Sequence, residues 1–212
     1  PLVAYGVVMK KIRKPMLVGL AIIGGLAALG MAAWIFIVSN VEQPKYVVVV
    51  QDGAFELRDY PALVVAEVTR QGNRNAAVRA GFSPLAGYIF AKTRDGESVS
   101  MTAPVTQTPS SPDSETWLVR FMMPSKYTLQ TLPKADGNDV RLVQVPPMRR
   151  AAIRFSGVAN DALIAVQETA LREWLAARKI ANPGTPTYAY YNDPFTPGPL
   201  RRNEVMFEVE AR

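Results

Sequence analysis

The chain has 212 residues, of which 49% are hydrophobic and 20% are charged, and its formal net charge is +6. It contains no Cys and no His, which excludes disulfides, thiolate nucleophiles, Cys/His zinc sites and Ser-His-Asp triads. This length suits one globular domain with an accessory segment.

The positive charge is concentrated near the N-terminus. Lys10, Lys11, Arg13 and Lys14 precede the first acidic residue, Glu42, and residues 41–212 then hold 20 basic and 18 acidic side chains. Positive and negative charges are therefore nearly balanced in this domain, and its basic residues form no recognisable nucleic-acid-binding motif. We therefore expect no nucleic-acid partner.

Residues 16–38 (MLVGLAIIGGLAALGMAAWIFIV) form an apolar run without charge, about 34 Å long as a helix and so sufficient to cross a bilayer. The run predicts an uncleaved, single-pass signal anchor in the inner membrane. Residues 1–15 would then be cytoplasmic and the domain periplasmic, because basic flanks stay inside. Gly24, Ala28 and Ala32 recur at four-residue spacing, which is either ordinary membrane-helix composition or a packing stripe for another subunit of a membrane complex.

A linker is predicted at 39–45. Residues 46–212 then form one domain that contains two similar patterns of strands and a helix. Runs at 46–50, 54–59 and 63–69 predict strands, and 74–91 predicts a helix with a break at Gly81 and Ser83-Pro84. The inward face of that helix would hold Val78, Phe82, Leu85 and Ile89. Residues 98–105 and 117–123 predict two further strands around a loop at 108–115.

The second pattern repeats this order. Strands are predicted at 140–145 and 148–157, the latter with Ala151, Ile153 and Phe155 on one face. Asn160 or Asp161 caps a helix that ends near Arg178 and buries Leu163, Val166, Ala170 and Trp174. Strands at 187–191 and 204–210 follow. The prediction is an α+β fold of duplicated β-α-β-β units, forming one curved antiparallel sheet or distorted β-barrel flanked by two helices.

Six strings in this order resemble the SOUL haem-binding protein family: FELRDYPALVVAEV (55–68), LAGYIF (85–90), MTAPVTQ (101–107), MPSKYTLQTLP (123–133), AAIRFSG (151–157) and RRNEVMFEV (201–209). They cover nearly everything from Pro44 to Val209. The family's fold resembles the duplicated, barrel-like arrangement with two helices, and it is similar to the effector-binding domains of bacterial regulators.

The resemblance implies non-covalent binding of haem or a related tetrapyrrole. A porphyrin needs an apolar slot with cationic groups at its rim. We expect the slot from Met101, Phe121, Met123, Tyr127, Phe155 and Trp174, and the rim from Lys126, Arg154, Arg201 and Arg202. Some family members bind haem through a histidine, which this chain lacks, so an axial ligand would have to be Met, Tyr or Lys.

Two alternatives remain open from the residues. In the first, the domain is a docking scaffold in a larger membrane complex and has lost its ligand. In the second it is a hydrolase, with Glu204 as an acid–base group beside Tyr188, Tyr190 or Tyr191. No paired carboxylates and no glycine-rich phosphate loop support an enzyme. We therefore expect a binding protein without catalytic or metal-ligating residues.

Overall fold

The computed structural model describes residues 19, 22–25, 30, 41–112, 114–180 and 184–210. The chain divides into two units, 1–40 and 41–212. The fold and the candidate site described below belong to the second unit.

The prediction of a transmembrane anchor is wrong for the part of the chain that the structure describes. A bilayer crossing needs about 20 consecutive helical residues, and no helix of the described residues is long and apolar enough for one. Only 19, 22–25 and 30 of the predicted span at 16–38 are described. Ala28 and Ala32 of the predicted stripe lie outside the described residues, and the inner-membrane, periplasmic placement loses its support with the anchor.

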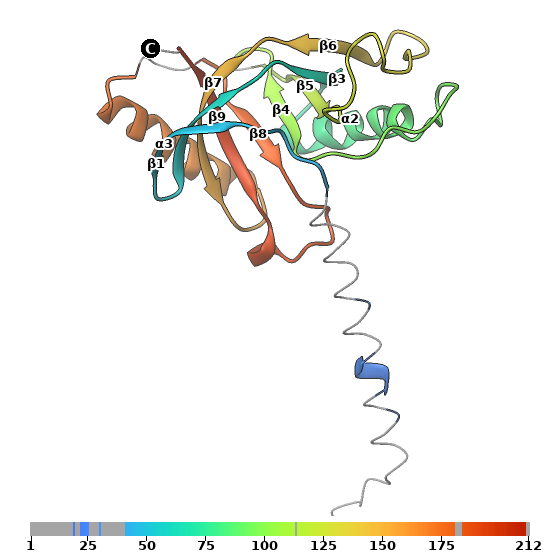
Figure 1. The fold of residues 1–212 in the computed structure, drawn as a ribbon. Helices are drawn as coiled ribbons and strands as arrows, with labels where there is room; N and C mark the ends of the chain where they lie inside the picture. Colours follow the sequence, from blue (N-terminus) through green and yellow to red (C-terminus); the bar gives the residue numbers. More distant parts are fainter. Residues whose placement is uncertain are drawn as a thin grey trace, which may run out of the picture. The chain divides into compact units, whose positions relative to one another are not determined.

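Nine strands form one antiparallel sheet in the order β1-β2-β7-β9-β8-β4-β5-β3-β6 (Figure 1). The strands are β1 Val47–Asp52, β2 Phe55–Tyr60, β3 Leu63–Gln71, β4 Val105–Pro109, β5 Thr116–Met122, β6 Arg141–Val145, β7 Met148–Phe155, β8 Thr187–Tyr190 and β9 Asn203–Val209. Helix α2 (Arg74–Ile89) separates β3 from β4, and α3 (Asp161–Ala177) separates β7 from β8. This order confirms the α+β class.

The sheet is open, so the prediction of a barrel is wrong. Closure would require hydrogen bonds between the terminal strands β1 and β6, and each of these pairs with a single neighbour among the described strands. β6 runs into Pro146-Pro147, which have no backbone N–H to offer a partner. β1 carries a register irregularity between Val48 and Val50, as expected of an edge strand.

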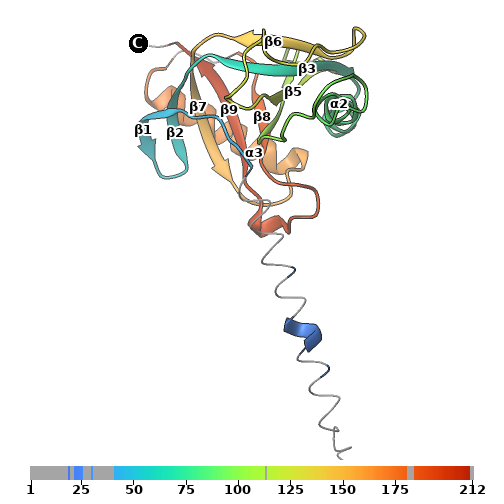
Figure 2. The same cartoon turned by 45° about the vertical axis from the view of Figure 1, so that its right-hand side comes forward.

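The two helices cover the same face of this sheet, which we call the helix face. α2 packs beside β3 and β5, and α3 beside β7 and β9 (Figure 2). The register aligns Val68, Val119, Gln107, Tyr188, Val205, Ile153 and Phe55 in one row on the helix face. The neighbouring row, with Glu67, Arg120, Thr106, Ala189 and Glu204, therefore points to the opposite side, which we call the inner face.

Helix α2 passes through Pro84 without the predicted break. Proline cannot donate to the carbonyl four residues earlier, Ala80, and Arg70 from β3 donates to that carbonyl through Nε at 3.2 Å instead. Gly81 lies against Val119, so α2 approaches the sheet closely there.

The buried faces of both helices differ from the prediction at one position each. Phe82 is 43% exposed and lies over the edge of the Phe121 ring, while Ala77 and Tyr88 are buried. Val166 is 62% exposed, because α3 turns Ile164, Leu171 and Leu175 toward the sheet.

The strand predicted at 98–105 is also wrong, since β4 starts only at Val105 and continues through Thr108 and Pro109. The preceding segment is tied to the end of α2, where the Val99 N–H donates to the Ile89 carbonyl at 2.6 Å. Val99 is buried against α2 and has no ladder partner.

Candidate functional site

Residues 41–46, which we call the N-terminal strap, cross from one half of the domain to the other. The Glu42 carbonyl accepts from Ala103 N–H at 2.9 Å, and the Glu42 carboxylate accepts from Ser125 N–H at 2.8 Å. Arg202, just before β9, donates to the Gln43 side chain at 3.1 Å. These hydrogen bonds hold the strap through Glu42 and Gln43, and at its other end the Tyr46 ring packs against the Arg58 guanidinium at 4.5 Å.

A cavity of about 180 Å³, the strap groove, opens beside this strap. Its walls come from the strings that carry the family resemblance: Pro61 and Leu63 from the first, Thr102 from MTAPV, and Met123 to Tyr127 from MPSKY. The full lining is Glu42, Gln43, Pro44, Lys45, Pro61, Ala62, Leu63, Val64, Thr102, Met122, Met123, Pro124, Ser125 and Tyr127. Segments far apart in the chain therefore converge on one groove.

Apolar side chains line much of the strap groove, and Glu42, Lys45, Thr102 and Ser125 add polar groups to its lining. Lys45 lines it, and the Lys126 amine lies 5.0 Å from the centre of the Tyr127 ring. Met122 and Met123 are buried at its floor, whereas Lys45 and Lys126 are exposed. Cationic side chains around an apolar slot suit a flat apolar ligand with carboxylates.

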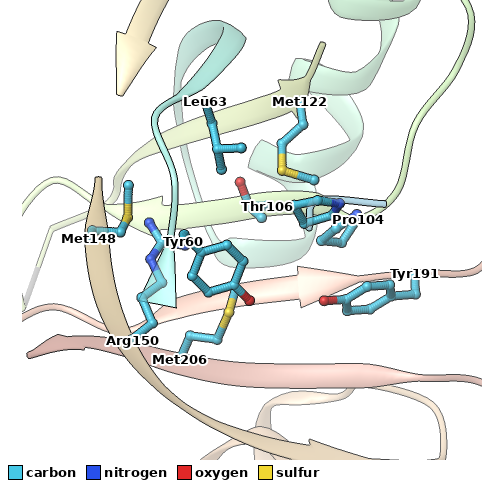
Figure 3. Close-up of a pocket in the computed structure, with 10 residues that line it drawn as sticks. Tyr60, Leu63, Pro104, Thr106, Met122, Met148, Arg150, Tyr191 and Met206 are labelled. Carbon is cyan, nitrogen blue, oxygen red and sulfur yellow. The ribbon is translucent and has the colours of Figure 1, made fainter. Parts of the chain in front are cut away.

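A second, smaller cavity of about 20 Å³ adjoins it on the inner face and shares Pro44, Leu63 and Met122 with it. Figure 3 shows the hydroxyls of Tyr60 and Tyr191 pointing toward one another from opposite sides of this cavity, with Met206 below Tyr60. Arg150 and Met148 close one side (Figure 3). We call it the inner-face cavity, and it has room for about one water molecule.

A buried charge cluster lies beside the inner-face cavity and centres on Glu204. Arg58 donates to both Glu204 carboxylate oxygens, at 2.7 and 3.0 Å, and Arg202 donates to Oε1 at 2.7 Å. The Tyr191 hydroxyl donates to Oε2 at 2.8 Å. Burial alone would raise the pKa of Glu204, but the hydrogen bonds and charges of Arg58 and Arg202 hold this pKa below its ordinary value.

This cluster does not have the properties of an acid–base catalyst. A carboxylate with a lowered pKa and both oxygens in ion pairs is a poor proton donor near neutral pH. Of the three tyrosines of the hydrolase alternative, only Tyr191 contacts Glu204. The Tyr188 hydroxyl bonds Glu168 of α3, and the Tyr190 hydroxyl lies 2.6 Å from an Arg74 nitrogen, both on the helix face.

The predicted slot residues divide between two apolar clusters on the helix face. Phe121 and Met123 are buried under α2, with Met101 and Tyr127 packed against them. Trp174 and Phe155 belong to the cluster under α3, where Trp174 stacks on Phe55 with ring centres 5.4 Å apart. The strap groove therefore brings together Met123 and Tyr127, with Lys126 beside them, but not Phe155 or Trp174.

The predicted rim arginines also separate. Arg154 is exposed on β7. Arg201 donates to the carbonyls of Thr196 and Pro194, which fixes the loop before β9. Arg202 lies over the Tyr191 ring at 3.8 Å in the Glu204 cluster.

Sequence reasoning missed Pro44, Leu63, Met122, Tyr60 and Arg150, which line the two cavities. Strand alternation carried a usable signal for Arg150. Ala151 and Ile153 of the same central strand lie on the helix face. Arg150 alternates with them and therefore points to the inner face, which no helix covers.

The fold and cavities define a class: an α+β domain of two similar halves, with a groove beside the N-terminal strap where the strings of the family resemblance meet. The sequence model described as "SOUL heme-binding protein" matches residues 41–208, so the chain belongs to this family. No curated protein matches the chain.

Solved structures share the fold at low identity. The C-terminal domain of EcmrR is 12% identical with a TM-score of 0.56, over 74% of this chain and 98% of that one. A hydrolase from Listeria innocua is 14% identical with a TM-score of 0.53, over 76% and 94%. An uncharacterized conserved protein from Listeria innocua is 13% identical with a TM-score of 0.52, over 80% and 93%. At such identities the likeness concerns the fold alone.

Proposed function

We propose that this domain binds haem or a related tetrapyrrole non-covalently at the strap groove, as a carrier, buffer or sensor. The observation that carries the proposal is the meeting of the family's strings at one apolar groove flanked by Lys45 and Lys126. Membership of the SOUL family supports the ligand class.

The size of the groove limits how such a ligand would bind. Pockets that enclose drug-sized ligands measure about 300–1,000 Å³, and the strap groove measures about 180 Å³. One edge of the ring would enter between Pro44 and Tyr127, and the rest would lie across the mouth. Carboxylates at that mouth would meet Lys45 and Lys126.

The donor set fits a tetrapyrrole held by shape and charge. Met123 and Tyr127 line the groove and Lys126 lies beside it, so a thioether, a phenol or an amine is the available iron ligand. Iron bound in haem would supply one-electron chemistry, but a site without histidine suits carriage or sensing better than a tuned redox potential.

The test is a titration of the full chain with haemin and with metal-free protoporphyrin, followed by absorbance and by quenching of tryptophan fluorescence. Equal, saturable binding of both would show that the groove recognises the ring and its carboxylates. Tighter binding of haemin would identify an iron ligand, and Met123→Leu and Tyr127→Phe would then distinguish the candidates.

The double variant Lys45→Gln/Lys126→Gln should bind both ligands roughly threefold to tenfold more weakly, since an exposed ion pair contributes about 0.2–1 kcal/mol. Lys134→Gln removes an exposed lysine away from the groove and serves as the control. Failure of both ligands to bind the wild type, or equal binding by the double variant and the control, would contradict the proposal.

A further inference from the structure

The inner-face cavity contains a cation without a partner. Arg150 forms no hydrogen bond and no ion pair within the described ranges, and its Nε is enclosed without an acceptor. The arginines near it are paired: Arg58 with Glu204, and Arg120 with Glu67 at 2.8 Å. Arg150 is therefore a partly buried guanidinium on this face that has no partner among the described residues and can take an anion.

The surroundings of Arg150 oppose its charge. Burial is the main factor that lowers the pKa of its guanidinium; Tyr60 and Glu208 favour the charged form and offset this effect only in part, and Arg120 adds repulsion. Glu208 faces Arg150 across the β7–β9 pair, but it is exposed and no ion pair of the described residues joins the two. A partly buried charge without a partner costs stability unless it is compensated, so a bound anion would remove this cost.

The walls of the cavity indicate what else such a ligand would carry. Met122, Met148 and Met206 provide adaptable apolar surface. The Tyr60 hydroxyl accepts from Arg58 at 3.3 Å, and its own proton has no acceptor among the described residues. Burial raises the pKa of Tyr60, so this hydroxyl stays protonated and can donate to an anion.

The dimensions exclude a ring at this position. The space beside Arg150 holds about one water, so it admits one oxygen of a carboxylate and not a macrocycle. Pro44, Leu63 and Met122 line both this cavity and the strap groove, so the two cavities are neighbours. An unbranched apolar tail from a carboxylate on Arg150 would reach the groove past these three side chains.

We propose that the inner-face cavity is a second binding site, which takes the carboxylate of a slender aliphatic acid on Arg150 with its tail in the strap groove. Tyr60 donates a second hydrogen bond to the carboxylate. The site does not require that the domain bind a tetrapyrrole.

The probe is octanoate, titrated into the full chain by calorimetry, with 1-octanol and acetate as ligands that lack the charge or the tail. We expect saturable binding of octanoate, and roughly tenfold or greater weakening for each of the other two. Arg150→Met should weaken the affinity for octanoate roughly tenfold or more. Arg79→Met removes an exposed charge on α2 and should leave the octanoate affinity unchanged.

Thermal unfolding separates a binding role from a structural one. Without ligand, Arg150→Met should melt at the same temperature as the wild type or higher, because it removes an unpaired charge. A lower melting temperature would assign Arg150 to the fold and overturn the proposal, as would equal octanoate binding by wild type and variant.

Haemin distinguishes the two proposals. Octanoate binding that depends on Arg150, with haemin affinity unchanged in Arg150→Met, supports a carboxylate site at Arg150 that haemin does not use, although both ligands would occupy the strap groove. If Arg150→Met weakens the binding of haemin but not that of octanoate, the cavity belongs to the tetrapyrrole site and the second site is disproved. Octanoate binding without haemin binding would contradict the tetrapyrrole proposal alone.

Discussion

Glu204 shows how a single buried carboxylate is kept charged in this domain. Its side chain is fully enclosed, yet both oxygens are in ion pairs and one also accepts from Tyr191. Arg58, equally buried, donates at the same time to Glu56 at 2.6 Å. The charges thus compensate one another within the cluster. Removing one of them would leave the remaining buried charges without full compensation, which costs stability.

Glu204→Gln should destabilise the domain by about 3–5 kcal/mol, because Arg202 would lose its carboxylate partner and the buried Arg58 would keep only Glu56 as a counter-charge. Urea denaturation measures the change. Glu173→Gln, at an exposed position of α3, is the control and should stay within about 0.5 kcal/mol of the wild type. If Glu204→Gln lowered the free energy of unfolding no more than the control does, the Glu204 ion pairs would make no net contribution to stability.

The same carboxylate predicts a pH dependence. Because the folded state holds the pKa of Glu204 below its ordinary value of 4.5, its contribution is complete above about pH 4.5 and is lost as the pH falls through the folded-state pKa. The stability difference between wild type and Glu204→Gln should therefore narrow on acidification. A difference that is constant or grows between neutral and acidic pH would contradict this assignment.

At the scale of elements, the contact of α2 with the sheet depends on a missing side chain. A Cβ at position 81 would lie 2.8 Å from the Cβ and Cγ2 of Val119, in the middle of β5. The helix therefore needs glycine for close approach, although glycine costs a helix about 1 kcal/mol relative to alanine. Arg70 completes this region by satisfying the carbonyl that Pro84 leaves free.

Gly81→Ala should destabilise the domain by about 1–3 kcal/mol, since overpacking outweighs the better helix propensity. Ser83→Ala, at an exposed position of the same helix, serves as the matched control and should be neutral or slightly stabilising. Val119→Ala should reduce the cost of Gly81→Ala in a double-mutant cycle. If Gly81→Ala stabilised the protein, the close approach would be disproved.

At the scale of the whole molecule, the N-terminal strap is the part that can open without disturbing the sheet. Three side chains of the strap, those of Glu42, Gln43 and Lys45, are exposed. β9, by contrast, pairs on both sides and is buried on both faces at its centre. Pro44 of the strap lines both cavities, so opening of the strap would widen access to each of them.

Hydrogen exchange should reveal this difference. The amides of Ala103 and Ser125, which donate to Glu42, should exchange faster than the β9 amides, because local opening needs less free energy than global unfolding. A ligand seated under the strap should slow them and leave β9 unchanged. Equal protection of both sets without ligand would mean that the strap opens only when the domain unfolds.

The α+β class, the two-part order of the elements and the family could all be read from the amino-acid sequence. Most strands and both helices lie where hydrophobic periodicity placed them, because that periodicity reports which side of an element faces an apolar layer. It also placed Val205, Phe207 and Val209 on one face of β9. It failed at 98–105, where the end of α2 and not a strand partner takes the backbone N–H of Val99.

The open edges of the sheet and the pairing of the charged side chains on its inner face could be found only from the three-dimensional structure. Periodicity separates two faces of a strand but does not say what covers the second one. The pairing of Arg58 with Glu204 and the lack of a partner for Arg150 depend on the register of strands far apart in the chain. The open edges at β1 and β6 and the convergence of distant strings on the strap groove arise from the same long-range pairing, which no local pattern records.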